Sequence, residues 1–423
     1  MKKLFVLFLI PIIMFSYINN VNAKEVVTET HMESVIMIDV ARRYYTVDEL
    51  KKYIDALSKN DNSTLQVHFT DDENVGIECS YLDQTKETAT NDNGVYTNPV
   101  TNKKFLTYEQ VNELMEYAKT KNVRFIPEID IPAHMKGFFT LAKNKFGEEY
   151  VRNRYDWDNP ENSGIAWGSG DEEGNLDIMS PNAKPFVKNL LDEYTEFFKD
   201  CEYFHMGFDE YTFRPELKID YANEIYEYLS NKGFKVRMWS DAITKDNIDD
   251  LNNKIEITYW GWKDDDILET NYATVPDLQE KGFKILITNK YYLFYVPNPE
   301  YSTQDDLNRA ISNINNNWAL EDWNYNFEGG LENHQNILGA MVCTWGENST
   351  GVDDNTITNH TINMYNAMFP KLDVYRKVVK TEEEMVNKPS IDNPNTLDNI
   401  HSNILLFIIS LLGFSSILVY INN

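Results

Sequence analysis

Eight short apolar runs alternate with helical patterns along the middle of this 423-residue chain. Most runs are continuously apolar or β-branched, which is typical of parallel strands buried on both faces of a sheet. Parallel strands joined by helices form either a closed barrel or an open, doubly wound sheet. The runs are Val35–Val40, Leu65–Thr70, Val123–Ile129, Tyr203–Phe208, Lys235–Ser240, Ile255–Trp260, Lys284–Thr288 and Leu338–Thr344.

Helical patterns occupy the intervals between these runs. Thr46–Ser58 and Thr107–Lys121 each begin with a Thr followed three residues later by Glu49 or Gln110, the capping-box pattern of a helix start. No glycine-rich phosphate loop follows an early run, so nothing favours an open nucleotide-binding sheet. We therefore expect an α/β fold with a single (β/α)8 TIM barrel. The other helical stretches are Pro185–Phe198, Tyr221–Asn231, Pro276–Lys281 and Gln304–Asn315.

Both ends of the chain carry apolar segments that do not belong to this pattern. Residues 1–23 combine two lysines, an apolar stretch and a final Ala, which predicts a secretory signal peptide. Residues 404–421 form a second apolar run, about long enough to span a bilayer. Between them we expect the folded domain at 24–380 and a polar linker at 381–403, which contains a degenerate sorting-like motif at 393–398. These features predict a secreted protein that the membrane or the cell wall retains at the cell surface.

Charge and side-chain chemistry exclude several functional classes. The formal net charge of −28 argues against nucleic acid as a partner, because such binding needs clustered Lys and Arg. Three scattered Cys give no disulfide framework, and the seven His show no metal-binding spacing. We therefore predict no metal site and no cofactor.

Polar and aromatic residues follow nearly every predicted strand. In a barrel of this type, the functional side chains project from the carboxyl ends of the strands. Carboxyl groups there can cleave glycosidic bonds, while aromatic rings and an Arg can hold a sugar, so the pattern predicts a carbohydrate site. The candidate site residues are Arg42, Asp71, His134, Asp209, Glu210, Trp239, Trp260, Tyr292, Trp345 and Glu347.

The adjacent acids Asp209 and Glu210 restrict the mechanism. Ordinary glycosidases place two carboxyl groups on opposite sides of the anomeric carbon, and those groups come from different strands. Neighbours at one strand end share one side of the substrate, so one can act as the general acid while the other orients a nucleophile. A 2-acetamido group on the sugar can supply that nucleophile through an oxazolinium ion.

Two segments resemble glycoside hydrolase family 20, the β-N-acetylhexosaminidases. His205–Glu210 is similar to the His-x-Gly-Gly-Asp-Glu motif of that family, and Pro127–His134 is similar to its segment after the third strand. The similarity covers nearly the whole barrel and is closer to one member that cleaves poly-β-1,6-N-acetylglucosamine of biofilm matrix. It implies that polymer as the substrate and partner. Alternatives are a general exo-β-N-acetylhexosaminidase acting on host glycans or chitin fragments, and a catalytically silent glycan-binding adhesin.

The resemblance also implies a role for each site residue. Glu210 is the expected general acid and base, with a pKa raised by an aromatic setting, and Asp209 orients the acetamide. Tyr292 matches the Tyr that hydrogen-bonds the acetamide oxygen. The remaining matches are the pocket walls Trp239, Trp260 and Trp345, the hydroxyl-binding residues Arg42 and Glu347, and a relay behind Glu210 formed by Asp71 and His134.

Three positions depart from the family pattern. Phe208 replaces the second Gly of the motif, and we expect its ring to shift the strand or to narrow the pocket floor. Phe213 and Phe294 stand where the closer relative has Tyr, so polar contacts beyond the core site are expected to be lost there.

Overall fold

The computed structural model describes residues 24–168, 174–211, 213–261, 271–324, 331, 333–375 and 377–383, with backbone alone at 24–30 and 377–383. It divides into two compact units, residues 31–376 and the two chain ends. In the described part of the ends, β1 (Lys24–Thr30) pairs antiparallel with β16 (Lys377–Glu383). The predicted signal peptide, most of the predicted linker and the predicted anchor segment lie outside the described residues. Within the described ranges, no helix has the length and apolar character needed to cross a membrane.

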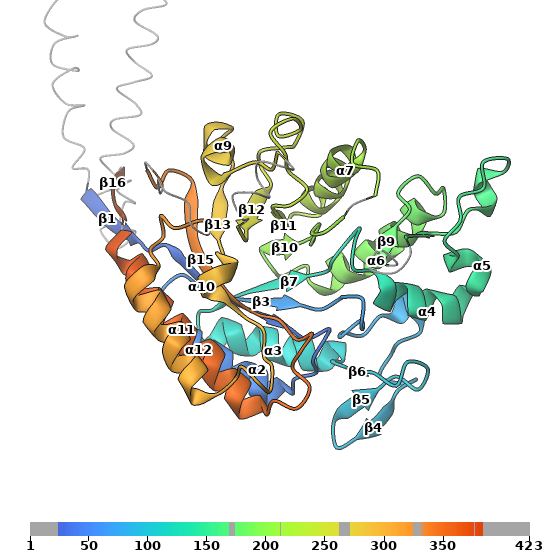
Figure 1. Ribbon diagram of the computed structural model, residues 1–423, viewed down its shortest axis with the longest axis horizontal. Helices are drawn as coiled ribbons and strands as arrows, with labels where there is room; N and C mark the ends of the chain where they lie inside the picture. Colours follow the sequence, from blue (N-terminus) through green and yellow to red (C-terminus); the bar gives the residue numbers. More distant parts are fainter. Residues whose placement is uncertain are drawn as a thin grey trace, which may run out of the picture. The chain divides into compact units, whose positions relative to one another are not determined.

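Eight parallel strands close into a barrel within the larger unit (Figure 1). Successive strands pair in chain order, and β15 closes the ring by pairing with both the preceding and the first strand. Each strand falls on one of the predicted apolar runs, so the predicted (β/α)8 barrel is confirmed. The strands are β2 (Glu33–Asp39), β3 (Ser63–His68), β7 (Arg124–Glu128), β10 (Tyr203–His205), β11 (Lys235–Trp239), β12 (Glu256–Tyr259), β13 (Ile285–Ile287) and β15 (Ile337–Thr344).

Helices connect most of these strands on the outside of the barrel. The capping boxes predicted at Thr46 and Thr107 are both present and begin the first two connecting helices. The connection at 240–255 contains turns and no helix. The helices are α2 (Val47–Leu57), α3 (Tyr108–Thr120), α4 (Lys136–Phe146), α5 (Glu148–Val151), α6 (Ala183–Phe197), α7 (Lys218–Asn231), α9 (Val275–Glu280), α10 (Lys290–Leu293), α11 (Gln304–Asn317) and α12 (Asp354–Leu372).

Short elements decorate the loops between the main strands. One antiparallel sheet follows β3, a two-stranded pair follows α5, and one short strand adds to β15. They are β4 (Thr90–Asp92), β5 (Val95–Thr97), β6 (Lys104–Phe105), β8 (Ala166–Trp167), β9 (Asn175–Leu176) and β14 (Phe294–Tyr295), with single 3₁₀ turns η1 (Ser80–Leu82), η2 (Pro160–Asn162) and η4 (Asp373–Tyr375).

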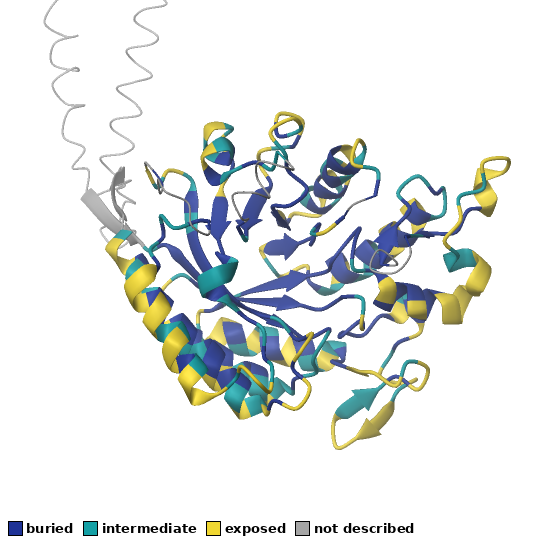
Figure 2. Cartoon of the chain, in the orientation of Figure 1, coloured by how far each residue is buried: buried dark blue, intermediate teal, exposed yellow. Residues whose placement is uncertain are grey.

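The barrel interior is packed and partly ionic. The strands are buried along their length, whereas helices such as α5 and α11 expose one face (Figure 2). Near the amino ends of the strands, buried Arg237 lies 2.6 Å from Glu33 and 3.0 Å from Glu256. A buried charge is tolerated only when it is paired and hydrogen-bonded, and this Arg has two acidic partners. The carboxyl ends of the strands are left to form the site.

Candidate active site

The backbone beyond β10 presents Asp209 and Glu210 to the same side. The strand ends at His205, and Gly207, Phe208 and Glu210 then adopt φ angles of 71°, 78° and 53°. In a regular strand successive side chains point to opposite faces. The left-handed residues break that alternation, so both acids line one cleft, as their adjacency led us to expect.

Asp130 holds this turn in place. Its Oδ1 accepts the backbone N–H of Phe208 at 3.1 Å. The same oxygen would lie 1.8 Å from a Cβ placed on Gly207, so only glycine fits at that position. The first Gly of the motif therefore serves the close approach of a buried carboxyl group.

The ring of Phe208 points away from the cleft. It is fully buried, with its centroid 6.4 Å from those of Tyr211 and Tyr221, and it belongs to the main hydrophobic core. The expectation that this ring narrows the pocket floor is therefore wrong. Its positive φ angle turns the side chain outward, where the core provides space.

A cleft of about 350 Å³ opens at the carboxyl ends of the strands. Eight of the ten predicted site residues line it, and the other two are Asp71 and Tyr292. Charged groups and aromatic rings share its wall, which is the composition expected for a sugar site. The lining residues are Arg42, Glu73, His134, Asp209, Glu210, Trp239, Trp260, Phe294, Val296, Trp345 and Glu347.

The two remaining predicted residues, Asp71 and Tyr292, are not among the described residues that line the cleft. Asp71 is 1% exposed, and its Oδ2 lies 2.7 Å from an Nη of Arg42, which does reach the cleft. Tyr292 on α10 packs against the main core and is not among the lining residues of the described chain. Its contact with an acetamide group stays a prediction. Phe294, two residues further along, reaches the cleft instead.

Glu73 and Val296 line the cleft but were missed by the sequence reasoning, which named Phe294 only as a departure from the family pattern. Glu73 follows the predicted Asp71 and its neighbour Asp72, so this run of three acids could have indicated it. Phe294 could have been found from its place after the seventh strand, where its ring stacks at 6.3 Å on Trp260 with an interplanar angle of 9°. Val296 carries no chemical signal that distinguishes it from core residues.

Buried carboxylates fix the aromatic walls. The indole nitrogen of Trp239 donates to Oε1 of Glu128 at 2.7 Å. Trp345 packs beside Trp239, with a centroid distance of 5.7 Å. Within the described residues, the indole nitrogen of Trp345 has no acceptor, although it is buried. A hydroxyl oxygen of a bound sugar could accept this hydrogen bond.

His134 links the two acids. Its Nε2 lies 3.4 Å from Oε2 of Glu210 and 3.7 Å from Oδ2 of Asp209, and its Nδ1 faces Asp72 at 3.5 Å. Burial disfavours the charged ring, but these carboxylates outweigh it and raise the pKa of His134 well above its usual range. The ring is therefore an imidazolium at neutral pH.

This imidazolium has a direct effect on Glu210. The hydrogen bond from His134 lowers the pKa of Glu210, although partial burial acts in the opposite direction. The Glu210 side chain is 59% exposed, so burial is the weaker influence. The expected rise of the Glu210 pKa is therefore wrong.

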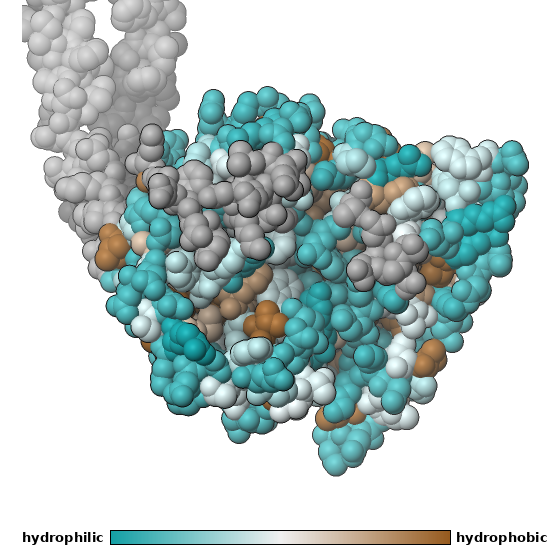
Figure 3. Space-filling view, in the orientation of Figure 1, coloured by the Kyte–Doolittle hydropathy of each residue, from teal (hydrophilic) through white to brown (hydrophobic). Residues whose placement is uncertain are grey.

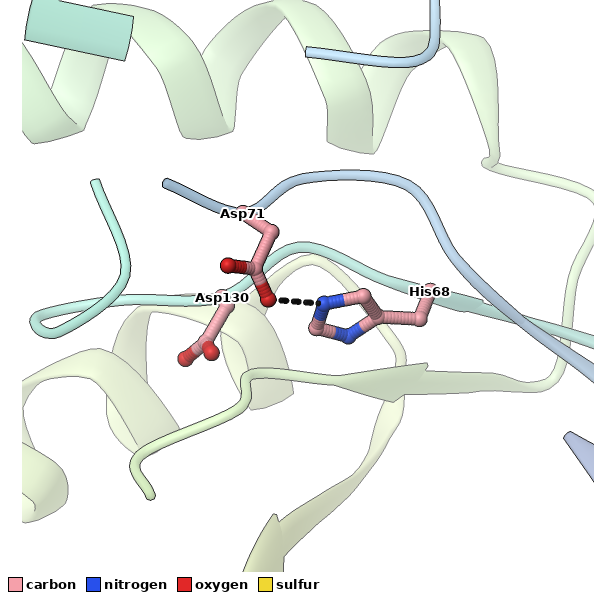
Figure 4. Close-up of side chains that lie close together, drawn as sticks. All are labelled: His68, Asp71 and Asp130. Atoms are coloured by element: carbon pink, nitrogen blue, oxygen red, sulfur yellow. Dashed lines mark hydrogen bonds and ion pairs between the residues drawn. The ribbon is translucent and has the colours of Figure 1, made fainter. Parts of the chain in front are cut away.

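His68 is fully buried and contacts Asp71, as the dashed line in Figure 4 shows. Nε2 of His68 lies 2.8 Å from Oδ2 of Asp71, and its Nδ1 lies 3.0 Å from Oε1 of Glu128. Despite burial, the charges of His205 and His68 lower the pKa of Glu128 to about 2. The chain Glu128–His68–Asp71 thus joins the indole of Trp239 to the guanidinium of Arg42.

Groups of His and Asp side chains at this point have the spacing of metal ligands. His68, Asp71 and Asp130 form one such group, and His134 joins two others. Arg42 already lies 2.7 Å from Asp71, and both histidines have raised pKa values. Metal ligands must be deprotonated, so a cation would compete with three positive charges already in place. These groups fit an ion-paired network better than a metal site.

Three acids around the turn have raised pKa values. Burial raises the pKa values of Asp130 and Asp209, and burial together with the charge of Asp209 raises the pKa of Asp241 to about 7. Oδ1 of Asp209 is buried and has no hydrogen-bond donor among the described residues. An unsatisfied buried acceptor is costly, so this oxygen is suited to accept an N–H from a ligand.

Residues 35–216 and 212–362 match the catalytic domain of glycosyl hydrolase family 20. The chain belongs to this family. Dispersin B, in its crystal structure, is similar to it at 32% identity and a TM-score of 0.73, covering 81% of this chain and 99% of that one. The family 20 resemblance predicted from the motifs is therefore confirmed.

Curated relatives of the family 20 domain are longer proteins. A β-hexosaminidase of Emericella nidulans is 22% identical over 370 residues, which make up 77% of this chain and 57% of that protein. A lacto-N-biosidase of Bifidobacterium bifidum is 27% identical over 283 residues, 60% of this chain and 22% of that protein. The chain thus spans little more than half of the first relative and about a fifth of the second.

Proposed function

We propose that this protein is a β-N-acetylhexosaminidase that cleaves β-linked N-acetylglucosamine by a substrate-assisted, retaining mechanism. The observation that carries this proposal is the position of Asp209 and Glu210, which line the same cleft from adjacent positions. Carboxyl groups on one side cannot flank the anomeric carbon as acid and nucleophile. The second nucleophile must then come from the substrate.

Each reacting group has a partner in the cleft. Oδ1 of Asp209 accepts the N–H of the 2-acetamido group, whose carbonyl oxygen then attacks C1. Glu210 gives its proton to the leaving oxygen as the C1–O bond breaks, which yields an oxazolinium ion and the released alcohol. A water molecule next attacks C1 and displaces the acetamide oxygen, which restores the 2-acetamido group. Glu210 takes the proton from the water, and the sugar leaves with its β configuration retained.

The surrounding side chains orient the sugar. Arg42 reaches the cleft with its charge balanced by Asp39, Asp71 and Glu73, so it donates hydrogen bonds to hydroxyl groups from a fixed position. Partial burial raises the pKa of Glu347, and its carboxyl group lines the same cleft as a further partner for sugar hydroxyls. The Trp walls provide flat apolar surfaces for the sugar ring.

We propose poly-β-1,6-N-acetylglucosamine as the natural substrate. The similarity to Dispersin B over 99% of that chain supports this choice. The net charge of −28 also supports it, because an acidic protein attracts a polymer that carries some free amines. A general exo-β-N-acetylhexosaminidase is the second candidate, and the curated relatives named β-hexosaminidase favour it.

Product analysis distinguishes these candidates. The full chain is incubated with 1,6-linked and with β-1,4-linked N-acetylglucosamine oligomers, and released sugar is quantified. Faster release from the 1,6-linked oligomer supports the polymer assignment, whereas faster release from the β-1,4-linked oligomer supports the general enzyme. Glu210→Gln should lower turnover by about 10²-fold or more while sugar binding is retained. Full biological effect in Glu210→Gln would instead indicate an adhesin.

A thiazoline mimic of the oxazolinium ion tests the mechanism. We expect strong competitive inhibition, because Asp209 and the Trp walls are arranged around the acetamide. Asp209→Asn should weaken that inhibition together with turnover. Cleavage of substrates without the acetamide at an equal rate would contradict substrate assistance.

A further inference from the structure

A hairpin-like segment extends from the loop between β7 and β10. Residues 150–168 double back on themselves, with Gly164 N donating to Arg154 O at 3.0 Å and Ile165 N donating to Tyr150 O at 3.0 Å. A Cβ on Gly164 would lie 1.8 Å from the backbone oxygen of Arg152, so the two arms approach as closely as glycine allows. This close pairing gives the segment a defined shape.

The base of the segment lies beside the reacting acids. Trp167 stacks on Phe213 with a centroid distance of 4.0 Å and an interplanar angle of 20°. Phe213 follows Glu210 by three residues, and the intervening Tyr211 belongs to the same small apolar cluster. Because Glu210 protonates the leaving oxygen in the proposed reaction, this side of the cleft faces the leaving part of the substrate.

The far end of the segment exposes an aromatic pair. Trp157 is 71% exposed, and its ring centroid lies 4.7 Å from that of Tyr155. Between them, Oδ1 of Asp156 accepts the backbone N–H groups of residues 158 and 159 at 3.1 and 3.0 Å, and its own N–H donates to Ser163 Oγ at 2.9 Å. These bonds hold a turn that keeps the indole directed to solvent.

A polar cleft of about 550 Å³ is formed by the same segment and its surroundings. Arg154 and Asp156, the chain neighbours of Tyr155, line it together with Asn162 and Asn182, so the turn that carries the aromatic pair also offers hydrogen-bond donors and acceptors. Stacking surfaces beside amide and charged groups suit a carbohydrate. A stable protein partner would need a far larger apolar area, and on the face shown in Figure 3 hydrophobic side chains form only small, separate patches.

We propose that Trp157, Tyr155 and the adjoining polar cleft form a second binding platform for the distal, leaving-group part of a β-linked N-acetylglucosamine chain. This inference rests on the proposed function and extends it to longer substrates. Trp157 at the tip and Trp167 at the base are ten residues apart along this segment, and neither Trp157 nor Tyr155 is among the described residues that line the cleft with the reacting acids. An oligosaccharide of several sugars can extend from the cleft to the platform, whereas a single sugar in the cleft cannot occupy both.

Substrate length provides the test. In the full chain, Trp157→Ala should raise the KM for long N-acetylglucosamine oligomers about five- to tenfold, because one stacked ring contributes roughly 1 kcal/mol. The value of kcat and all constants for an aryl β-N-acetylglucosaminide should stay unchanged. Trp157→Phe should restore part of the affinity. Tyr301→Ala is the matched control, because Tyr301 is 66% exposed in a different loop.

Binding without turnover separates this inference from the proposed reaction. In the Glu210→Gln chain, co-sedimentation with insoluble poly-β-1,6-N-acetylglucosamine should fall about fivefold when Trp157→Ala is added. Competition by monomeric N-acetylglucosamine should be the same with and without Trp157→Ala. Unchanged sedimentation, or an equal loss with Tyr301→Ala, overturns the platform. If the wild-type chain fails to cleave the aryl glycoside, the proposed function fails, and the sedimentation result still decides the platform.

Discussion

The indole nitrogen of Trp260 donates a hydrogen bond to Oδ1 of Asp241, 3.3 Å away. The other oxygen of this carboxyl group accepts the backbone N–H of Glu210. Asp241 is only 6% exposed and does not itself line the cleft, so it acts through its two partners. It couples the position of the proposed general acid to that of an aromatic wall.

Asp241→Asn should therefore lower kcat. An amide has one acceptor oxygen and cannot satisfy both N–H donors, so either Glu210 or Trp260 loses its anchor. A small displacement of a reacting group costs about 10- to 100-fold in rate. Steady-state kinetics on an aryl N-acetylglucosaminide measures this, with the exposed Asp249→Asn as the control. An effect confined to KM would contradict the positioning role of Asp241.

The same substitution should change how stability depends on pH. Burial and the charge of Asp209 raise the pKa of Asp241 to about 7, above its ordinary value of 3.8. A raised folded pKa gives stability that is fully present at low pH and is lost as the pH rises through 7. Between pH 4 and 8, Asp241→Asn should lose less thermal stability on alkalinisation than the wild type. An equal change of melting temperature with pH in both proteins would refute the assignment of this raised pKa to Asp241.

His134→Gln should move the alkaline limb of the pH–rate profile. The imidazolium lowers the pKa of Glu210, and a neutral amide removes this effect. Glu210 must hold a proton to act as the acid, so a higher pKa extends activity to higher pH. Measurements of kcat/KM from pH 3 to 9 should show the alkaline limb at higher pH than in the wild type, together with a lower maximal kcat/KM. His334→Gln, in which a histidine paired with Glu321 is changed, should leave the profile in place.

The strands and most of the site could be predicted from the sequence because their signals are local. Continuous apolar runs mark strands buried on both faces, and the barrel topology then brings their carboxyl ends together. This reasoning placed eight of ten site residues in the cleft. It did not assign Phe294 to the cleft, because the conformation of the short helix and strand at 290–295 decides which side chains point there.

Other features depended on neighbours that are distant in the sequence. The pKa of Glu210 is set by His134, which arrives from another loop, so an argument from aromatic surroundings alone gave the wrong direction. Helix α12 was not predicted, since Pro370 stands inside it and polar residues interrupt its apolar pattern. The left-handed backbone conformation of Phe208 could not be predicted either. It depends on the hydrogen bond from the Phe208 N–H to Asp130, and the residue types at these positions do not indicate that contact.

Phe208 offers a stability test of this held conformation. Its φ angle of 78° is strained for a side chain with a Cβ, whereas glycine adopts it freely. Loss of the buried ring costs about 3–5 kcal/mol, but glycine should recover about 1 kcal/mol of that cost relative to alanine. Phe208→Gly should therefore be more stable than Phe208→Ala.

Phe204, a fully buried residue of β10 outside the left-handed region, should show the opposite order. There alanine should exceed glycine by about 0.5–1 kcal/mol, because glycine weakens an ordinary strand. Denaturant unfolding of the four variants measures both differences. Because the Phe208 ring lies outside the cleft, Phe208→Gly should keep kcat within a few-fold of wild type at temperatures where it is folded. The same order at both positions would contradict the strained conformation of Phe208. Loss of turnover in a folded Phe208→Gly protein would show that the ring contributes to the site.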